Sequence, residues 1–424
     1  HALDLPMHAV QVEVRRMGGA FGGKESQGNA LAIACAVLAQ RTGKPCKMRY
    51  DRDDDFKITG KRHDIRIDYD VAFTAEGKVT AIRFDHYMRC GWSQDLSLPV
   101  ADRAMLHADN AYFIPHMEIT SYRLRTNMQS ATAFRGFGGP QGMAGIERVM
   151  DHVAHHLGKD PLAVRQANFY QKGETTHYGQ KVEDFVLDRL VPDLARRCDY
   201  AKRRAEIATW NATQNILKRG IALTPVKFGI SFTLTHLNQA GALVHVYQDG
   251  SIALNHGGTE MGHGLFQKVA QVAAERLGVP LDQVKITATD TAKVPNTSAT
   301  AASSGSDLNG MAVAVACDKI KAAIAAWFAP LHQAQPEAVR FGEGMVTVNG
   351  TAHPWAAVIA QAYQARVPLS ATGFYKTPSI AWDRDKGEGR PFYYFSYGAA
   401  CSEVVVDTLT GENRILRTEI PVSY

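Results

Sequence analysis

The residues with the clearest chemical potential lie in a glycine-rich stretch near the start of the chain, Met17-Gly-Gly-Ala-Phe-Gly-Gly-Lys-Glu25. Glycine lets backbone N–H groups approach a bulky ligand and adopt positive φ angles. Residues 7–14 alternate like a strand before this stretch, and residues 30–39 form an apolar, helix-forming run after it. A helix behind such a loop presents unpaired N–H groups and the positive end of its dipole. The stretch therefore predicts a site for a large anionic ligand, with Phe21 and the Glu25 carboxylate at its mouth.

The same stretch satisfies the phosphate-binding pattern G-x-x-x-x-G-K between Gly18 and Lys24. In that pattern the next residue is Ser or Thr, whose hydroxyl binds Mg²⁺. Here it is Glu25, which would repel the phosphates and leave the metal without its hydroxyl ligand. We therefore do not expect nucleotide hydrolysis. Taken alone, the loop has a purely structural alternative, a tight turn in which Glu25 interacts with the helix dipole.

Three further loops of glycine and small residues also precede predicted helices. The loops are residues 133–141, 256–264 and 297–306, and the helices are expected at residues 142–157, 265–277 and 311–327. No single loop of this kind is specific. Four of them in one chain predict that an elongated anionic ligand is held from several sides, because several helix N-termini can share its phosphates.

Length and composition exclude several classes of protein. A chain of 424 residues predicts two or more domains, and the absence of a basic tract interleaved with aromatics argues against nucleic-acid binding. The longest apolar run is about ten residues, well short of the roughly 20 of a membrane helix. The six cysteines form no C-x-x-C pair, which argues against zinc or iron–sulfur ligation and predicts reduced thiols in the cytoplasm. The start at His1, without a methionine or a signal peptide, predicts a segment of a longer chain.

Hydrophobic patterning predicts an α+β protein made of two large mixed α/β subdomains, residues 1–215 and 216–424. Residues 90–110 are expected to be rich in loops, and residues 184–215 to be mostly helical. Strands are expected at residues 46–51, 63–73, 78–89, 116–126, 221–233, 242–247, 251–255, 392–395, 401–407 and 415–420.

Five motifs resemble the molybdenum-cofactor-binding part of the xanthine dehydrogenase and xanthine oxidase family. They are MGGAFGGKE, TAFRGFGGPQG, FGISF, HGGTEMGHGL and PNTSATAASSGSD, and they occur in the family's order over nearly the whole chain. The resemblance implies a molybdenum–molybdopterin cofactor in its sulfido form, held between the two subdomains, with the substrate pocket on the first. The cofactor-binding positions that it implies are Phe21, Gly22, Arg135, Met261, Gly262, His263, Thr300, Ala302, Ser303 and Ser306.

Within this set, the resemblance implies that Phe21, Arg135 and Ala302 lie beside the metal. His263 departs from the family, which usually has glutamine at this position. Histidine can also donate a hydrogen bond. Its protonation would make activity more dependent on pH, and the alternative is a neutral substitution.

The same resemblance implies a purine pocket with Glu25 and Arg103 as catalytic residues. Glu25 would hydrogen-bond the purine edge, and Arg103 would stabilise negative charge that grows on the ring. Phe137 and Phe232 would sandwich the flat substrate, with Thr233, Leu96 and Leu237 completing the wall. Without the motif matches, an arginine is usually a solvated surface group and such aromatics usually belong to the core.

The implied activity is oxidation of hypoxanthine and xanthine to urate with water-derived oxygen, a step of purine catabolism. Electrons would pass to FAD and two 2Fe–2S clusters on other segments or subunits, in a dimer of protomers. The family's catalytic glutamate lies in a Gly-Glu-Pro-Pro motif that this sequence lacks, as it lacks the glutamine upstream of the first loop, so we expect this polypeptide alone to be inactive. Two alternatives stay open: an aldehyde oxidase-type enzyme, expected to lack the pair of Glu25 and Arg103, and a non-catalytic degenerate copy.

Overall fold

The computed structural model describes residues 2–293, 297–301 and 303–421, and the chain divides into two compact units. Unit 1 consists of His1–Arg49 and Leu234–Pro378, and unit 2 of Tyr50–Thr233 and Ser379–Tyr424. Both units mix helices and strands, as the sequence predicts. The boundary predicted near residue 215 lies inside unit 2 and stays a prediction about subdomains.

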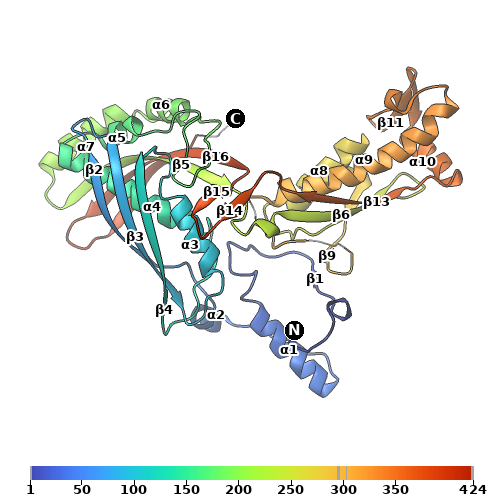
Figure 1. Cartoon of the computed structure of the whole chain (residues 1–424), viewed down its shortest axis with the longest axis horizontal. Helices are drawn as coiled ribbons and strands as arrows, with labels where there is room; N and C mark the ends of the chain where they lie inside the picture. The colour runs from blue at the N-terminus through green and yellow to red at the C-terminus, as the bar shows by residue number, and fades with distance from the viewer. Residues whose placement is uncertain (1, 294–296, 302, 422–424) are drawn as a thin grey trace. The chain divides into compact units, whose positions relative to one another are not determined.

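The core of unit 1 is a four-stranded sheet in the order β13-β6-β7-β8. Its β7–β8 pair is parallel and the other two pairs are antiparallel. Helices α8 and α9 bury Val269, Leu277, Val313 and Ile320 in the hydrophobic core of this unit, together with Val244 and Leu254 of the sheet. The bounds are β6 (Gln239–Val246), β7 (Ile252–His256), β8 (Val284–Ile286), β13 (Ser370–Lys376), α8 (Leu265–Leu277) and α9 (Gly305–Leu331) (Figure 1).

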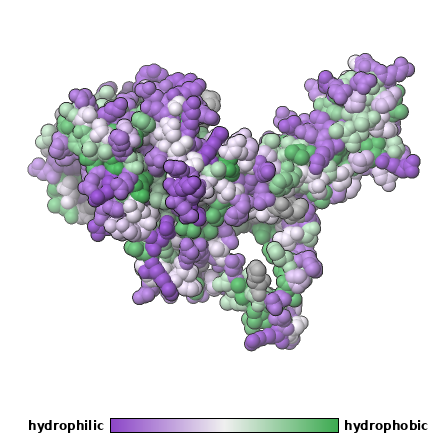
Figure 2. Space-filling view, viewed as in Figure 1, coloured by the Kyte–Doolittle hydropathy of each residue, from purple (hydrophilic) through white to green (hydrophobic). Residues whose placement is uncertain are grey.

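Helix α1 (Asn29–Thr42) forms where the apolar run predicts it, yet none of its residues is buried. Figure 2 shows apolar and polar residues mixed on the surface of this segment. The strand predicted at residues 7–14 is wrong except for β1 (Glu13–Val14), which pairs with β9 (Thr289–Asp290). A 3₁₀ turn occupies Met7–Ala9 instead, directly after Pro6, which has no N–H for a strand ladder.

The remaining described elements of unit 1 are short, apart from one helix. They are η1 (Met7–Ala9), η2 (Thr235–Leu237), η3 (Leu281–Gln283), η4 (Pro336–Ala338), β10 (Arg340–Gly342), β11 (Met345–Val348), β12 (Thr351–Pro354) and α10 (Trp355–Gln364).

Unit 2 contains two three-stranded sheets, in the orders β2-β3-β4 and β17-β16-β5, and the hairpin β14–β15. The strands predicted at residues 63–73 and 78–89 are confirmed as β2 and β3, which pair antiparallel. The strands predicted at 392–395 and 401–407 form one strand, β16, which pairs with β5 along its whole length. The bounds are β2 (Ile65–Phe73), β3 (Val79–Gly91), β4 (His116–Arg125), β5 (Leu217–Ile230), β14 (Ala381–Asp383), β15 (Glu388–Arg390), β16 (Tyr394–Asp407) and β17 (Asn413–Glu419).

Two helices of unit 2 are not predicted from the sequence. Helix α2 (Arg52–Ile58) follows residues 46–51, which form no strand, and the Asp51 side chain accepts from the Asp54 N–H at 2.8 Å as its N-cap. Helix α3 (Ser97–Leu106) lies in the stretch predicted as loop, because Pro99 falls in its first turn, where proline is tolerated. The others are α4 (Gly139–Leu157), α5 (Pro161–Ala167), α6 (Leu187–Arg197) and α7 (Tyr200–Thr213).

Helix α7 packs on β5, so the predicted boundary near residue 215 separates two elements in direct contact. The Asn211 side chain donates to the Arg219 carbonyl at 2.9 Å. Among the described helices, none combines the length and the apolar composition of a membrane span. All six cysteines are free thiols, as predicted, and Cys90, Cys198, Cys317 and Cys401 are buried.

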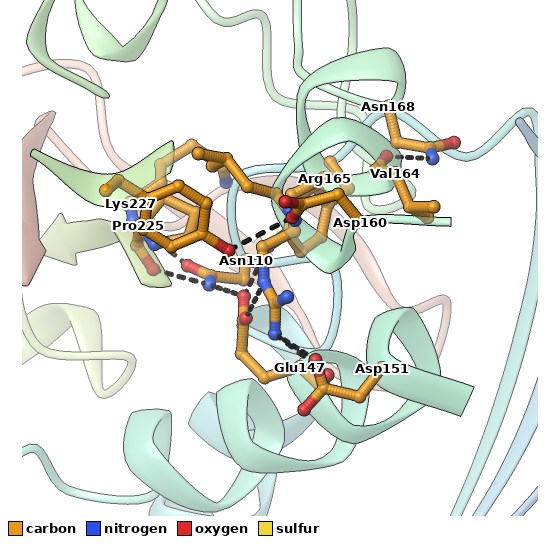
Figure 3. A network of polar contacts seen from close by, with 12 residues as sticks. Asn110, Glu147, Asp151, Asp160, Val164, Arg165, Asn168, Pro225 and Lys227 are labelled. Carbon is orange, nitrogen blue, oxygen red and sulfur yellow. Dashed lines mark hydrogen bonds and ion pairs between the residues drawn. The ribbon is translucent and has the colours of Figure 1, made fainter. Parts of the chain in front are cut away.

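A polar network joins α4 and α5 to β5 through Asn110 (Figure 3). Glu147 accepts from the Arg165 Nε at 2.7 Å and from the Asn110 side chain at 2.8 Å. Asn110 also donates to the Pro225 carbonyl at 2.9 Å and accepts from the Lys227 N–H at 3.1 Å. These bonds fix the position of β5 relative to the two helices.

Helices α3 and α4 approach each other through two glycines one helical turn apart. A Cβ atom on Gly138 would lie 2.0 Å from the Val100 carbonyl oxygen, and one on Gly142 would lie 2.0 Å from the Ala104 carbonyl oxygen. Only glycine permits this separation, because both clashes are with backbone atoms. The glycine loop before α4 therefore holds α3, the helix that carries Arg103.

Candidate functional site

Three of the four small-residue loops belong to unit 1, and hydrogen bonds join them. The Met17 N–H donates to the Glu260 carbonyl at 2.8 Å, which connects the first loop to the loop of residues 256–264. The Thr259 N–H donates to the Thr300 hydroxyl at 2.9 Å, which connects the latter loop to residues 297–306. The first loop, which is more than 200 residues before the other two in the sequence, is thus joined to them within unit 1.

The Glu260 side chain shapes the central loop. Its Oε1 atom accepts from the Gly262 and Gly264 N–H groups at 2.7 and 3.1 Å, and its Oε2 atom accepts from the Phe266 N–H at 3.0 Å, in the first turn of α8. Burial alone would raise the pKa of this carboxyl, but the three N–H groups outweigh it and hold the pKa below its usual value. Glu260 is not among the residues predicted from the sequence, although a carboxylate just before a helix start is a recognisable signal.

Glu260→Ala is expected to lower the free energy of unfolding of the full-length protein by about 1–3 kcal/mol at pH 7, because it leaves three N–H groups without an acceptor. A depressed carboxyl pKa stabilises the fold above the ordinary value of 4.5, and this contribution is lost as the pH falls below it. The difference between wild type and variant, measured by urea unfolding, should therefore shrink below pH 4.5. Glu275→Ala, at an exposed position on α8, is the matched control; equal stability of both variants would contradict this role for Glu260.

Three of the predicted cofactor-binding residues lie in this loop, and a fourth, Thr300, is hydrogen-bonded to it. Both ring nitrogens of His263 are buried and form no hydrogen bond with any described residue, and Nδ1 lies 3.7 Å from the Glu260 Oε1. Met261 and Gly262 adjoin His263, and Gly262 has a positive φ of 95°. Ser303 is exposed and Ser306 lies in the first turn of α9. Ala302 lies outside the described residues. The roles of these residues stay predictions.

Two aromatic residues in the glycine loops have left-handed backbones. The φ angle is 57° at Phe21, in unit 1, and 53° at Phe137, in unit 2. Such a conformation costs a non-glycine residue about 1–3 kcal/mol and is concentrated at functional sites. The Phe21 ring is 62% exposed and lies over Gly19, where a Cβ atom would come within 2.7 Å of it. The strain at both positions supports a functional reason for each aromatic.

In unit 2, the Arg103 guanidinium is buried without a carboxylate partner among the described residues. The side chain is 5% exposed; one terminal nitrogen donates to the Gly229 carbonyl at 2.9 Å and the other to the Ser231 carbonyl. The rings of Phe392, Phe228 and Phe137 have centroids at 5.1, 5.2 and 6.0 Å from its central carbon.

Burial lowers the pKa of Arg103 to about 10, so the group is still a cation at neutral pH. Its Nε atom is buried and has no hydrogen-bond partner among the residues that the structure describes. A buried cation that lacks a carboxylate is costly unless an anionic group binds beside it. This arrangement therefore favours a ligand that carries or develops negative charge.

The structure brings five of the seven predicted pocket residues together in unit 2. The rings of Phe137 and Phe232 meet edge to face, with centroids 6.4 Å apart. The Thr233 hydroxyl donates to the Pro99 carbonyl of α3 at 3.4 Å. Leu96 directly precedes α3 and packs in the same cluster as Phe137. Glu25 and Leu237 belong to unit 1, where Glu25 is exposed and Leu237 ends η2.

Several residues that support the pocket are not predicted from the sequence. Arg62 donates to the Arg135 carbonyl at 2.8 Å and lies over the Phe134 ring at 4.4 Å, so it fixes the second glycine loop. Phe228 and the Gly229 carbonyl lie within the FGISF motif, which was a usable signal. Phe392 is distant in the sequence, and no local pattern identifies it.

Two family models match the chain. Residues 1–169 match one molybdopterin cofactor-binding domain and residues 193–422 match another. The chain is 45% identical over 421 residues to the xanthine dehydrogenase of Drosophila subobscura, and 44% identical over 418 residues to the xanthine dehydrogenase/oxidase of Rattus norvegicus. Each alignment covers 99% of this chain and 30% of the relative, so the chain spans about a third of the length of these proteins.

Solved structures share the fold. Quinoline 2-oxidoreductase from Pseudomonas putida 86 superposes with a TM-score of 0.84 at 21% identity, over 98% of this chain and 54% of that one. The aldehyde oxidoreductase from Desulfovibrio gigas gives a TM-score of 0.81 at 26% identity, over 98% of this chain and 43% of that one. The mixed helix-and-strand fold predicted from the sequence is thereby confirmed.

Proposed function

We propose that this chain, which belongs to the family of molybdopterin cofactor-binding domains, forms the cofactor- and purine-binding part of a xanthine dehydrogenase. The observation that carries the proposal is the buried Arg103 cation, which has two carbonyl acceptors, an aromatic surround and no carboxylate partner among the described residues. A purine that is being hydroxylated is flat, and negative charge grows on its ring. The Arg103 cation can stabilise this charge, and the rings of Phe137 and Phe232 can pack against the flat ring. A simple aldehyde requires neither the cation nor the two aromatic rings.

The residues of unit 1 fit an anionic pterin cofactor. Three joined loops precede helices α1, α8 and α9, whose N-termini carry the positive ends of their dipoles, and His263 adds two buried ring nitrogens that bond to no described residue. When bound, the cofactor supplies the water-derived oxygen and accepts two electrons. We assign Met261, Gly262, His263, Thr300 and Ser306 to holding the cofactor, and Phe21 to the reacting side of the loop.

The residues of the chain itself bind and orient the purine. Phe137 and Phe232 hold the ring, Glu25 accepts a hydrogen bond from its edge, and Arg103 stabilises the negative charge that grows during hydroxylation. One preorganised donor of this kind contributes about 10²–10³ in rate. We assign the proton-accepting glutamate, the FAD and the iron–sulfur clusters to other parts of the enzyme, which we place in the cytoplasm as a dimer of protomers.

The test is the activity of the full-length enzyme that contains these residues. We expect molybdenum in the purified protein and xanthine-dependent reduction of NAD or of an artificial acceptor, with kcat/KM for xanthine well above that for benzaldehyde. A molybdenum-containing enzyme that oxidises benzaldehyde but not xanthine would indicate the aldehyde oxidase-type alternative. Protein without molybdenum and without either activity would indicate a degenerate copy.

A further inference from the structure

The His107 side chain lies between the helix that carries Arg103 and the strand that receives its guanidinium. Its Nε2 atom accepts from the Gly229 N–H of β5 at 3.0 Å, and its Nδ1 atom lies 2.9 Å from the Arg103 carbonyl, one helical turn back. A backbone N–H can only donate, so Nε2 carries no proton, and the proton on Nδ1 is donated to the Arg103 carbonyl. Both ring nitrogens are thus satisfied by the neutral form.

The contacts of His107 repeat those of Arg103. Arg103 donates its guanidinium to the Gly229 carbonyl, and His107 accepts from the N–H of the same glycine. The imidazole also packs against the two rings that cover the guanidinium, with centroids 4.8 Å from Phe228 and 5.1 Å from Phe392. The ring therefore fixes the distance between the backbone of Arg103 and the carbonyl that holds its side chain.

The surroundings keep His107 neutral. The side chain is 1% exposed, and burial, with the neighbouring cations Arg103 and Lys227, lowers its pKa well below the usual value. Protonation would place an N–H on Nε2 against the Gly229 N–H. Among the described residues, the ring nitrogens of His107 form only these two hydrogen bonds. The bonds join the Arg103 carbonyl to the Gly229 N–H of β5.

We propose that His107 is a positioning residue, which aims the Arg103 guanidinium at the bound purine by bridging the Arg103 carbonyl and the Gly229 N–H. The inference rests on the proposed purine site and adds a residue to it. It predicts that substitution of His107 lowers kcat/KM for a substrate whose oxidation depends on Arg103. For a substrate that does not depend on Arg103, kcat/KM should change little.

The test measures kcat/KM for xanthine and for benzaldehyde in the full-length enzyme, normalised to molybdenum content. His107→Phe retains an aromatic ring but loses both hydrogen bonds, and we expect about a tenfold or larger loss with xanthine and a change within about twofold with benzaldehyde. In an Arg103→Met background the same substitution should cause no further loss with xanthine, because residues that act through each other are non-additive.

Two amide variants provide a matched comparison. They replace His107→Phe in the test if that variant does not fold well enough to be purified. The amide oxygen of His107→Gln can occupy the place of Nε2 and accept from the Gly229 N–H, whereas His107→Asn reaches only the Arg103 carbonyl. We expect most of the xanthine activity in the Gln variant and a loss of about tenfold in the Asn variant.

Equal values for the Gln and Asn variants, equal losses on both substrates, or additive losses in the Arg103→Met background would overturn the positioning role. Wild-type enzyme that contains molybdenum but does not turn over xanthine would instead overturn the proposed function, so the two failures are distinguishable.

Discussion

Arg103→Met is expected to lower kcat/KM for xanthine by about 10²–10³-fold in the full-length enzyme, with molybdenum content unchanged. Methionine retains most of the apolar stem, which packs near Phe228 and Phe392, but removes a cation that is 95% buried. The two carbonyls of Gly229 and Ser231 lose their donor, so a small loss of stability accompanies the loss of activity. Steady-state kinetics with xanthine and benzaldehyde measure the effect.

The controls separate charge from packing. Arg103→Lys retains the cation but cannot reproduce the planar fork that reaches two carbonyls, so an intermediate loss is expected. Arg125→Met, at an exposed position on β4, should leave both activities unchanged. Unchanged xanthine turnover in Arg103→Met would show that Arg103 is not part of the proposed pocket. An equal loss of activity with benzaldehyde would show that Arg103 has only a structural role.

The sequence predicts the parts of the site whose signals are local. Helix α8 begins after a glycine loop and ends at Gly278, and it occupies residues 265–277 as predicted. Strands β2 and β3 likewise follow from hydrophobic patterning at residues 63–73 and 78–89. Phe137 lies close to Phe232 and to Arg103, as the resemblance to the family implies for residues of one substrate pocket.

Contacts between segments that are far apart in the chain are not predicted by local sequence patterns. Strand β16 pairs with β5 from nearly 180 residues further along the chain, and no local pattern indicates this pairing. The carbonyls of Gly229 and Ser231 that hold Arg103 have no side-chain signature. Helix α3 was missed because Pro99 suggests a break, while the glycine contacts with α4 that stabilise the helix are tertiary.

Lys227→Met is expected to destabilise the full-length protein by about 3–5 kcal/mol, because it leaves the buried Asp109 carboxylate without its cation. Lys227 and Asp109 are each 1% exposed, and the ammonium lies 3.2 Å from the Asp109 Oδ2 atom. Tyr170 donates to the same oxygen at 2.8 Å, and the Lys227 ammonium lies 4.4 Å from the centroid of the Phe395 ring. The midpoint of urea unfolding, followed by circular dichroism, measures the loss.

A second substitution tests the reason for that loss. If the cost comes from an uncompensated buried charge, replacing both partners, as in Lys227→Met with Asp109→Leu, should recover much of the stability, since buried ion pairs are often replaceable by apolar groups. Lys172→Met, at an exposed position in the same unit, should change the unfolding midpoint little. A Lys227→Met midpoint equal to that of Lys172→Met would contradict the role of Lys227 as the cation that compensates the buried Asp109 carboxylate. Because Lys227 lies two residues before Gly229 on β5, its variant should also disturb the carbonyl that holds Arg103. The loss of stability and a loss of xanthine turnover should therefore appear together.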